Sequence, residues 1–198
     1  TIPTGSAFPP SWMSLPDVPL KVAMRPLTAD AGPITAPSTL TCAIDQLDPR
    51  ATLLIGTHKP LGMMEGIDRS PDLVAFVGYH TGAGEPGVLA HTYLPNSITS
   101  VRINGETASE GRMNALLAAE YGVPVALVTG DDLTCADAAT YAPTAVGVTV
   151  KTCVDRYSAL CLPPAVSAQL ITEGARRAAE RTHSPAGTSA PYTYEVGF

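Results

Sequence analysis

The stretch Leu73-Val-Ala-Phe-Val77 is apolar at all of its positions. Strands that are covered on both faces have this composition, and they form the centre of parallel sheets. The stretch Pro124-Val-Ala-Leu-Val128 has the same character and predicts a second central strand. Other runs bounded by glycine, proline or polar residues predict further strands at 52–56, 87–93, 98–103, 145–151 and 192–196. The chain therefore predicts a sheet with a buried centre.

Helices are predicted between these strands. In the range 110–121 apolar side chains recur at helical spacing, and Gly122 ends the pattern. Further helices are predicted at 135–141 and 164–181, and Asn104-Gly105 predicts a tight turn. Strands that alternate with helices predict an α/β fold with a mostly parallel β-sheet flanked by helices.

Ligands of such sheets bind beyond the carboxyl ends of the strands. The residues that directly follow predicted strands are therefore candidates for a site. They are His80, the segment Gly130-Asp131-Asp132, which is predicted as a loop, and Lys151.

Composition excludes several classes of protein. With 198 residues, 45% of them apolar and 15% charged, the chain can build one domain with a core and is not a disordered chain. Its net charge of −6 argues against partners such as nucleic acid or an anionic membrane. No apolar run has the length of a membrane span, and the first ten residues lack the pattern of a signal peptide.

Four cysteines occur without a Cys-x-x-Cys pair, at 42, 135, 153 and 161. This spacing predicts neither a zinc finger nor a redox motif. Free thiols in a reducing cytoplasm are the simplest interpretation, and a cytoplasmic location is expected.

Composition changes near residue 38. Eight of the 19 prolines lie between Pro3 and Pro37, and each proline removes a backbone donor and fixes φ. We therefore expect residues 1–37 to be irregular, to add no strand to the central sheet and to supply no metal ligand. Residues 38–198 are expected to form the α/β domain.

Few residues are suited to chemistry. Of the four histidines, His183 lies in a polar tail and is expected to be solvated, and His58 lies in a loop. His80 and His91 lie among apolar residues, where core histidines and metal ligands are equally consistent with the sequence. Glu110 begins a predicted helix. A carboxylate at this position also stabilises a helix simply through its favourable interaction with the helix dipole. Together, two histidines and a glutamate could begin a zinc site.

Several motifs resemble one family in order and approximate spacing from about residue 48 to about residue 182. They are Lys59-Pro-Leu-Gly-Met-Met-Glu-Gly-Ile-Asp68, Val77-Gly-Tyr-His80, Gly87-Val-Leu-Ala-His-Thr92, Ile103-Asn-Gly105, Tyr121-Gly-Val-Pro-Val125 and Thr129-Gly-Asp-Asp132. With Glu110 downstream of the fourth motif, they resemble the M55 family, D-aminopeptidases of the DppA type.

The resemblance implies a zinc-dependent aminopeptidase that hydrolyses short peptides with N-terminal D-amino acids, of the D-Ala-D-Ala type. It implies that His80 and Glu110 are zinc ligands in a site for two ions. It also implies that His91 is catalytic, as a nucleophile or an acid–base group. A homo-oligomer is implied as well, because the family assembles as a ten-subunit ring.

The chain departs from the family pattern before residue 48. The family's Asp-x-Glu ligand pair and its Asn-Asp-Ser-His-like segment have no counterpart here. This departure predicts an incomplete version of the family fold that binds fewer than two zinc ions. Two functions stay open: an active D-aminopeptidase, and a truncated or degenerate homologue that keeps only the scaffold.

Overall fold

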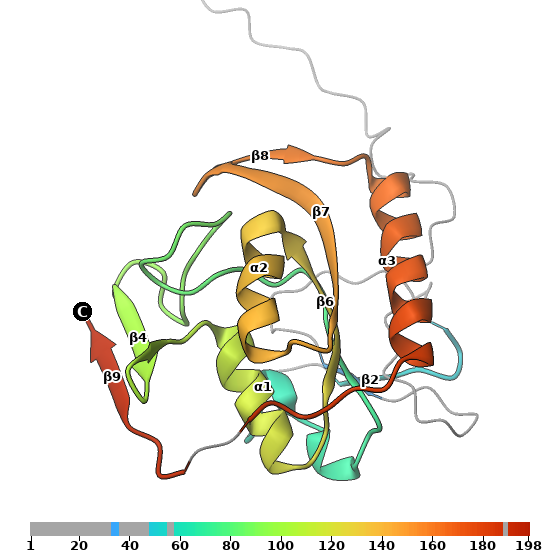
Figure 1. Ribbon diagram of the computed structural model, residues 1–198, viewed down its shortest axis with the longest axis horizontal. Coiled ribbons are helices and arrows are strands. Elements are labelled where there is room, and N and C mark those ends of the chain that lie inside the picture. The colour runs from blue at the N-terminus through green and yellow to red at the C-terminus, as the bar shows by residue number, and fades with distance from the viewer. Residues whose placement is uncertain (1–32, 36–47, 55–57, 188–189) are drawn as a thin grey trace, which may run out of the picture.

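The computed structural model of the chain describes residues 33–35, 48–54, 58–187 and 190–198. Its centre is a four-stranded sheet in the order β3-β6-β7-β8 (Figure 1). These strands are β3 (Val74–Phe76), β6 (Val125–Asp131), β7 (Val146–Asp155) and β8 (Ser158–Cys161). The first three run parallel, and β8 returns antiparallel to β7. The mostly parallel sheet predicted from the apolar runs is therefore confirmed.

Helices cover both faces of this sheet. The helix α1 (Glu110–Glu120) contacts α2 (Asp132–Tyr141), and α2 packs on β6 and β7. The helix α3 (Pro164–Glu180) packs on the same two strands, and Figure 1 shows it on the face opposite α2. The strand β6 is consequently buried at every position, as was predicted for its apolar part at 125–128.

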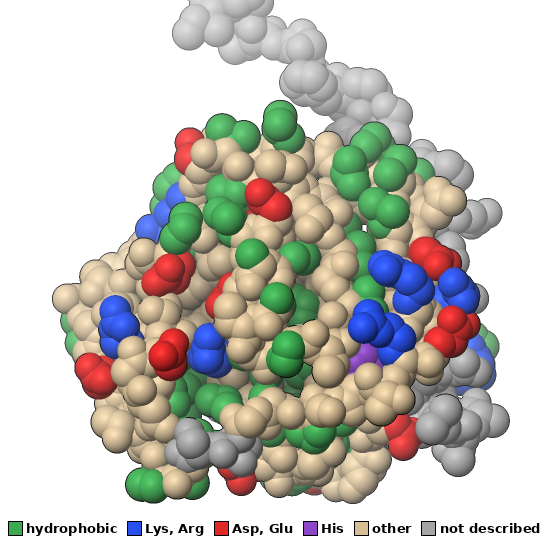
Figure 2. Space-filling model, viewed as in Figure 1, with side chains coloured by type: hydrophobic (Ala, Val, Ile, Leu, Met, Phe, Trp, Pro, Cys, Tyr) green, Lys and Arg blue, Asp and Glu red, His purple; other side chains and the backbone are tan. Residues whose placement is uncertain are grey.

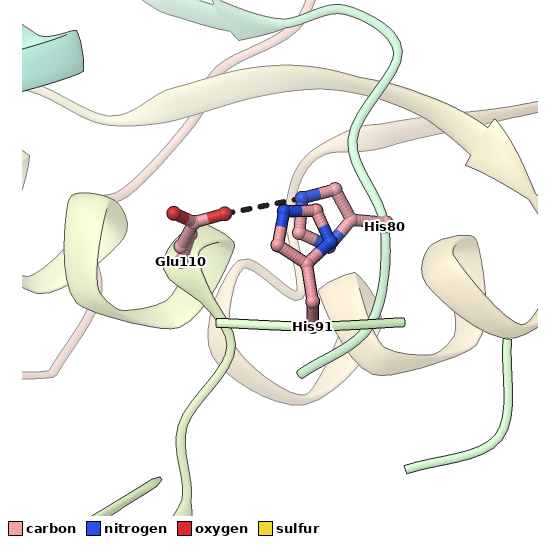
Figure 3. A group of neighbouring side chains, drawn as sticks. All are labelled: His80, His91 and Glu110. Carbon is pink, nitrogen blue, oxygen red and sulfur yellow. Dashed lines mark ion pairs between the residues drawn. The ribbon is translucent and has the colours of Figure 1, made fainter. Parts of the chain in front are cut away.

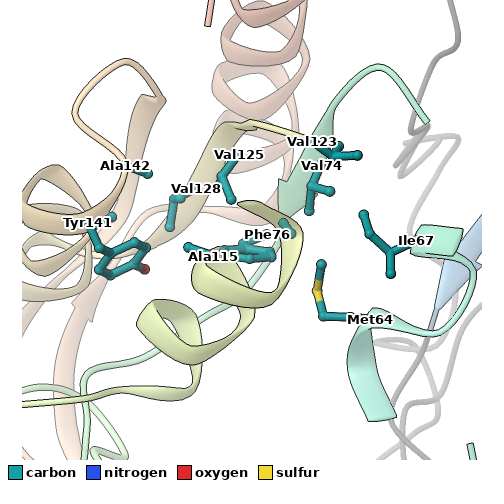
Figure 4. Close-up of a cluster of buried hydrophobic side chains, with 12 residues drawn as sticks. Met64, Ile67, Val74, Phe76, Ala115, Val123, Val125, Val128, Tyr141 and Ala142 are labelled. Carbon is teal, nitrogen blue, oxygen red and sulfur yellow. The ribbon is translucent and has the colours of Figure 1, made fainter. Parts of the chain in front are cut away.

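The core around the four-stranded sheet lies in two layers, one on each face. The larger layer joins β3 and β6 to α1 and α2, and Phe76 and Val128 are among its least exposed members (Figure 4). The smaller layer joins Leu127, Val146 and Val148 to Ala178 of α3. The neighbouring residues Leu127 and Val128 of β6 thus pack in opposite layers, since successive side chains of a strand point to opposite faces.

Two smaller sheets complete the described structure. One is antiparallel, in the order β5-β4-β9, with β4 (Ser100–Ile103), β5 (Glu106–Thr107) and β9 (Tyr194–Gly197). Asn104 and Gly105, at φ values of 51° and 82°, form the predicted turn between β4 and β5. The other pairs β1 (Pro33–Thr35) with β2 (Thr52–Leu54) in parallel. Two 3-10 helices, η3 (Gly62–Met64) and η4 (Ile67–Arg69), precede β3.

The prediction of irregular structure for residues 1–37 is wrong at Pro33–Thr35, which form β1. Proline is compatible with β1 because Pro33 is the first residue of the strand and β1 is an edge strand of a two-stranded sheet. The strand β1 pairs with β2 and not with the four-stranded sheet. Residues 1–32 lie outside the described part of the chain.

The predicted strand at 87–93 is also wrong, because this segment forms a compact loop. Gly87, Leu89 and Tyr93 adopt φ values of 149°, 55° and 54°, which are incompatible with a strand. The predicted loop at Gly130-Asp131-Asp132 is wrong as well. The first two of these residues end β6, and Asp132 begins α2.

Candidate functional site

Three residues from separate segments meet at one end of α1. His80 follows β3, His91 lies in the loop 81–93, and Glu110 is the first residue of α1. One potential ligand atom from each lies within 4.8 Å of the other two (Figure 3). The expected convergence of His80 and Glu110, with His91 close by, is confirmed. We call these three residues the His80–His91–Glu110 cluster.

The carboxylate of Glu110 is oriented by one backbone group and one imidazole. Ser109 caps the helix by accepting a hydrogen bond of 3.2 Å from the backbone N–H of Arg112. The Oε1 atom of Glu110 accepts a hydrogen bond of 3.3 Å from the backbone N–H of Tyr93. Its Oε2 atom lies 3.1 Å from Nε2 of His80. The residue is only 8% exposed, so these partners stabilise a charge that burial alone would disfavour.

His80 presents a defined nitrogen to Glu110. Its Nδ1 lies 2.9 Å from the carbonyl oxygen of Thr81, which can only accept, so Nδ1 carries the proton. Burial by itself lowers the pKa of His80 and is the largest single influence. The hydrogen bonds to Glu110 and Thr81 and the charges of Glu110 and Asp131 together outweigh burial, and they raise the pKa.

His91 repeats this arrangement. Its Nδ1 lies 2.6 Å from the carbonyl oxygen of Leu89, which leaves Nε2 for other partners. The rings of His80 and His91 stack, with centroids 3.9 Å apart and planes at 18° (Figure 3). Metal-binding histidines fix their tautomer in this way, with one ring N–H donated to a carbonyl and the other nitrogen turned to the ion. Two imidazole nitrogens and one carboxylate oxygen are a donor set that fits zinc.

The loop 81–93, which carries His91, is held by buried side chains. Thr92 is fully buried and accepts a hydrogen bond of 3.0 Å from the backbone N–H of Ala83. Asp131, also fully buried, accepts one of 2.7 Å from Val88 N–H through Oδ2 and one of 2.6 Å from Thr134 N–H through Oδ1. Asp131 therefore joins the loop to the N-terminus of α2.

A cavity of about 840 Å³ adjoins the cluster at Glu110. It lies between one face of α1, the sheet of β4 and β9, and the segment 58–63. Apolar side chains predominate in its lining, which comprises His58, Lys59, Pro60, Leu61, Gly62, Met63, Tyr93, Ile98, Val101, Glu110, Met113, Asn114, Leu116, Leu117, Glu120, Tyr192, Tyr194 and Val196.

The other candidates from the sequence lie elsewhere. Lys151 is part of β7, and Asp132 accepts a hydrogen bond of 2.8 Å from the backbone N–H of Cys153. The expectation that His183 is solvated is wrong, because its half-buried ring lies with Nε2 2.7 Å from the carbonyl oxygen of Ala178 at the end of α3. Within the described ranges, no other group of three histidine, cysteine or acidic residues converges as the cluster does.

Sequence reasoning missed Tyr93. Its backbone N–H orients Glu110, and this contact depends on a left-handed backbone that an aromatic residue rarely adopts. No sequence signal announces such a conformation at a tyrosine.

None of the helices in the described part of the chain combines the length and the apolar character that a membrane crossing requires.

Known proteins match most of the chain. The family model of peptidase family M55, described as D-aminopeptidase, matches residues 40–198. A D-aminopeptidase of Bacillus subtilis (strain 168) is 35% identical over 130 residues, which are 66% of this chain and 47% of that protein. A solved structure, the Zn-dependent D-aminopeptidase DppA from Bacillus subtilis, a self-compartmentalizing protease, is similar with a TM-score of 0.73 and 31% identity. That similarity covers 77% of this chain and 56% of the solved chain. The chain thus spans about half the length of these relatives.

Proposed function

The chain belongs to the M55 family of D-aminopeptidases, and we propose that it releases the N-terminal residue from short D-amino-acid peptides with the help of zinc. The observation that carries this proposal is the His80–His91–Glu110 cluster, whose ligand atoms lie within 4.8 Å of one another. Peptides of the D-Ala-D-Ala type are the proposed substrates. The family match begins at residue 40, close to the proposed domain boundary near residue 38.

In this proposal His80 and Glu110 bind zinc. The Nε2 atom of His80 and the Oε2 atom of Glu110 already face each other at 3.1 Å, and a cation between them would satisfy both. When bound, zinc polarises a carbonyl group and lowers the pKa of a coordinated water to about 7. The backbone N–H of Tyr93 holds the other oxygen of Glu110, so the carboxylate keeps its direction.

His91 is proposed as the residue that transfers a proton or attacks the substrate. Its Nδ1 is engaged by the carbonyl of Leu89, so Nε2 is the nitrogen that accepts or delivers a proton. The ring stacks on His80 and therefore stays beside the proposed metal ligands. A general acid–base group in this position contributes about 10²–10⁴ to the rate of a hydrolysis.

The test is hydrolysis of D-Ala-D-Ala by the zinc-loaded chain and by the variant His91→Ala. We expect the variant to lose about 10²–10⁴ in kcat while its circular dichroism spectrum is unchanged. His183→Ala serves as the matched histidine variant, because His183 contacts the end of α3 and not the cluster. Full activity in His91→Ala would remove His91 from the proposed mechanism.

The small number of metal ligands in the cluster favours a second candidate function. A site for two metal ions needs more donors than the cluster supplies within the described residues. A scaffold without catalysis is therefore the alternative. Elemental analysis after gel filtration separates the two proposals. Bound zinc together with turnover supports the peptidase, whereas a chain that binds no zinc and leaves D-Ala-D-Ala intact supports the scaffold.

We also propose that the chain forms a homo-oligomer, as a ring of ten subunits. The strand β8 is an edge strand, and the stretch Tyr157-Ser-Ala-Leu-Cys-Leu162 carries no charge that would protect this edge from pairing. Tyr157 and Leu160 are 75% and 70% exposed, and Figure 2 shows apolar side chains on the surface over β8 and the start of α3. Light scattering during gel filtration tests this proposal. The substitution Leu160→Lys is expected to lower the mass of the assembly.

A cytoplasmic setting is proposed as well. Cys135, Cys153 and Cys161 are free thiols, as a reducing compartment favours. Cys42 lies outside the described residues.

A further inference from the structure

The cavity beside Glu110 extends along the whole of α1. Met113, Asn114, Leu117 and Glu120 line it together with Glu110, and their spacing places them on one face of the helix. Glu110 and Glu120 are the first and last residues of α1, ten positions apart, which corresponds to about 15 Å of helix. An extended peptide advances about 3.3–3.6 Å per residue, so the cavity has the length of about four residues.

The walls of this cavity are apolar over most of that length. Ile98, Val101 and Val196 of β9 line it together with Leu116 and Leu117 of α1. A volume of about 840 Å³ lies within the range of roughly 300–1,000 Å³ that is usual for ligand sites. A cavity of this kind favours a ligand with apolar side chains, because burying them removes apolar surface from water.

Tyr93 connects the cavity to the cluster. The backbone of Tyr93 is left-handed, at φ 54°, and its N–H donates to Glu110 while its side chain lines the cavity. Strained backbone that is kept beside a site is often part of that site's function. The hydroxyl of Tyr93 lies 3.8 Å from Sδ of Met113. Burial and the charge of Glu110 raise the pKa of Tyr93, and Tyr194 lines the same cavity.

We propose that this cavity binds the part of a peptide that follows the N-terminal D-residue, and that it selects a large apolar side chain at the second position. The inference rests on the proposed aminopeptidase function, in which the scissile bond lies at the His80–His91–Glu110 cluster. An aminopeptidase removes a single residue, so a cavity that leads away from the cluster along α1 receives the part of the peptide that follows this residue, beginning with the second side chain. Tyr93 and Met113 line the cavity at the end nearest the cluster, and Tyr194 belongs to the same lining.

The test uses two peptides of identical composition and opposite order, D-Ala-D-Leu and D-Leu-D-Ala. Calorimetric titration of the full chain after chelation gives their affinities without turnover. We expect D-Ala-D-Leu to bind about tenfold more tightly, which is the selectivity that an apolar pocket gains from added methylene groups. Equal affinities, or tighter binding of D-Leu-D-Ala, would overturn the proposal.

Two tyrosine variants test the location of the selectivity. Tyr194→Ser removes an aromatic ring that lines the cavity and is 60% exposed. Tyr157→Ser is the control, because it removes a tyrosine that is 75% exposed but lies next to β8, away from the cavity lining. The preference for D-Ala-D-Leu is expected to fall to about twofold or less in the first variant and to persist in the second, given the tenfold effect. A parallel loss in both would contradict the assignment. Val196→Trp, which adds volume to the same wall, gives an independent check if Tyr194→Ser does not fold.

Zinc content and hydrolysis of the two peptides separate this inference from the proposed function. A chain that binds no zinc and cleaves neither peptide, yet prefers D-Ala-D-Leu through Tyr194, supports the cavity assignment and rejects the peptidase. A chain that cleaves both peptides with the same kcat/KM and binds them equally supports the peptidase and rejects the cavity assignment.

Discussion

Asp131→Asn changes one buried oxygen to an NH2 group without changing the shape of the side chain. Asp131 accepts hydrogen bonds from two backbone donors, Val88 N–H at 2.7 Å and Thr134 N–H at 2.6 Å. An asparagine has one carbonyl oxygen, so in either orientation of the amide one backbone N–H faces a second donor. The side chain is fully buried, and water cannot replace the lost acceptor. We therefore expect Asp131→Asn to destabilise the loop 81–93 or the start of α2.

The magnitude follows from the two bonds. A hydrogen bond to a charged group contributes about 1.5–3 kcal/mol, so Asp131→Asn should lower the free energy of unfolding by that amount. Asp131→Ala removes the cap of α2, at about 0.5–2 kcal/mol, and also leaves Val88 N–H unsatisfied, at about 1–3 kcal/mol. Its total cost of about 1.5–5 kcal/mol should equal or exceed that of the asparagine variant.

Asp132→Asn is the matched control. Asp132 accepts from a single backbone donor, Cys153 N–H, and an asparagine can still turn its carbonyl oxygen to that group. Only the favourable charge at the start of α2 is lost, at about 0.3–1 kcal/mol. Urea denaturation followed by circular dichroism measures the three variants. If Asp131→Asn proved as stable as Asp132→Asn, the reasoning that Asp131 joins the loop to α2 would be refuted.

Two further predictions concern the packing around α1. Gly111→Ala should destabilise the chain by about 1–3 kcal/mol in thermal unfolding, although alanine favours helices, because its Cβ would collide with the hydroxyl of Tyr141. The double variant Gly111→Ala/Tyr141→Phe should recover part of the lost stability, because it lacks the hydroxyl. A double variant as unstable as Gly111→Ala would contradict this explanation. Burial raises the pKa of Asp137, against the opposing effects of Ser109 and Arg112. A carboxyl group with a raised pKa contributes stability that is present below its unfolded pKa of about 3.9 and is lost as the pH rises through the folded pKa. Asp137→Asn should therefore gain stability relative to the parent chain between about pH 3 and about pH 7, and a difference that is constant or declines with pH would exclude this explanation.

Local sequence patterns were sufficient for the centre of the fold. The runs at 73–77 and 124–128 are apolar at every position, so only strands covered on both faces could accommodate them. The helix α1 begins at a capping serine and ends before Gly122, which are signals that act over a single turn. The turn at Asn104-Gly105 was equally predictable, because few other dipeptides tolerate two left-handed residues.

Predictions failed where distant residues decide the structure. The segment 87–93 is apolar enough for a strand, yet it folds as a loop because Asp131, 43 positions from Val88, accepts one of its backbone hydrogen bonds. The strand β8 has no strong pattern of its own and forms because β7 pairs with it. His183 looked solvated in a polar tail, but α3 offers a carbonyl oxygen to its ring.

The sequence by itself determined the central strands at 73–77 and 124–128, the three helices, the motifs of the M55 family and the selection of His80, His91 and Glu110 as candidate site residues. Only the tertiary structure decided that the two imidazoles stack at 3.9 Å, that each fixes its Nδ1 on a carbonyl, and that the cavity along α1 begins at Glu110. The physical reason is the range of the interactions. Propensities and caps act between neighbours in the chain, whereas the cluster depends on backbone groups and helix ends that come together only when the sheet has formed.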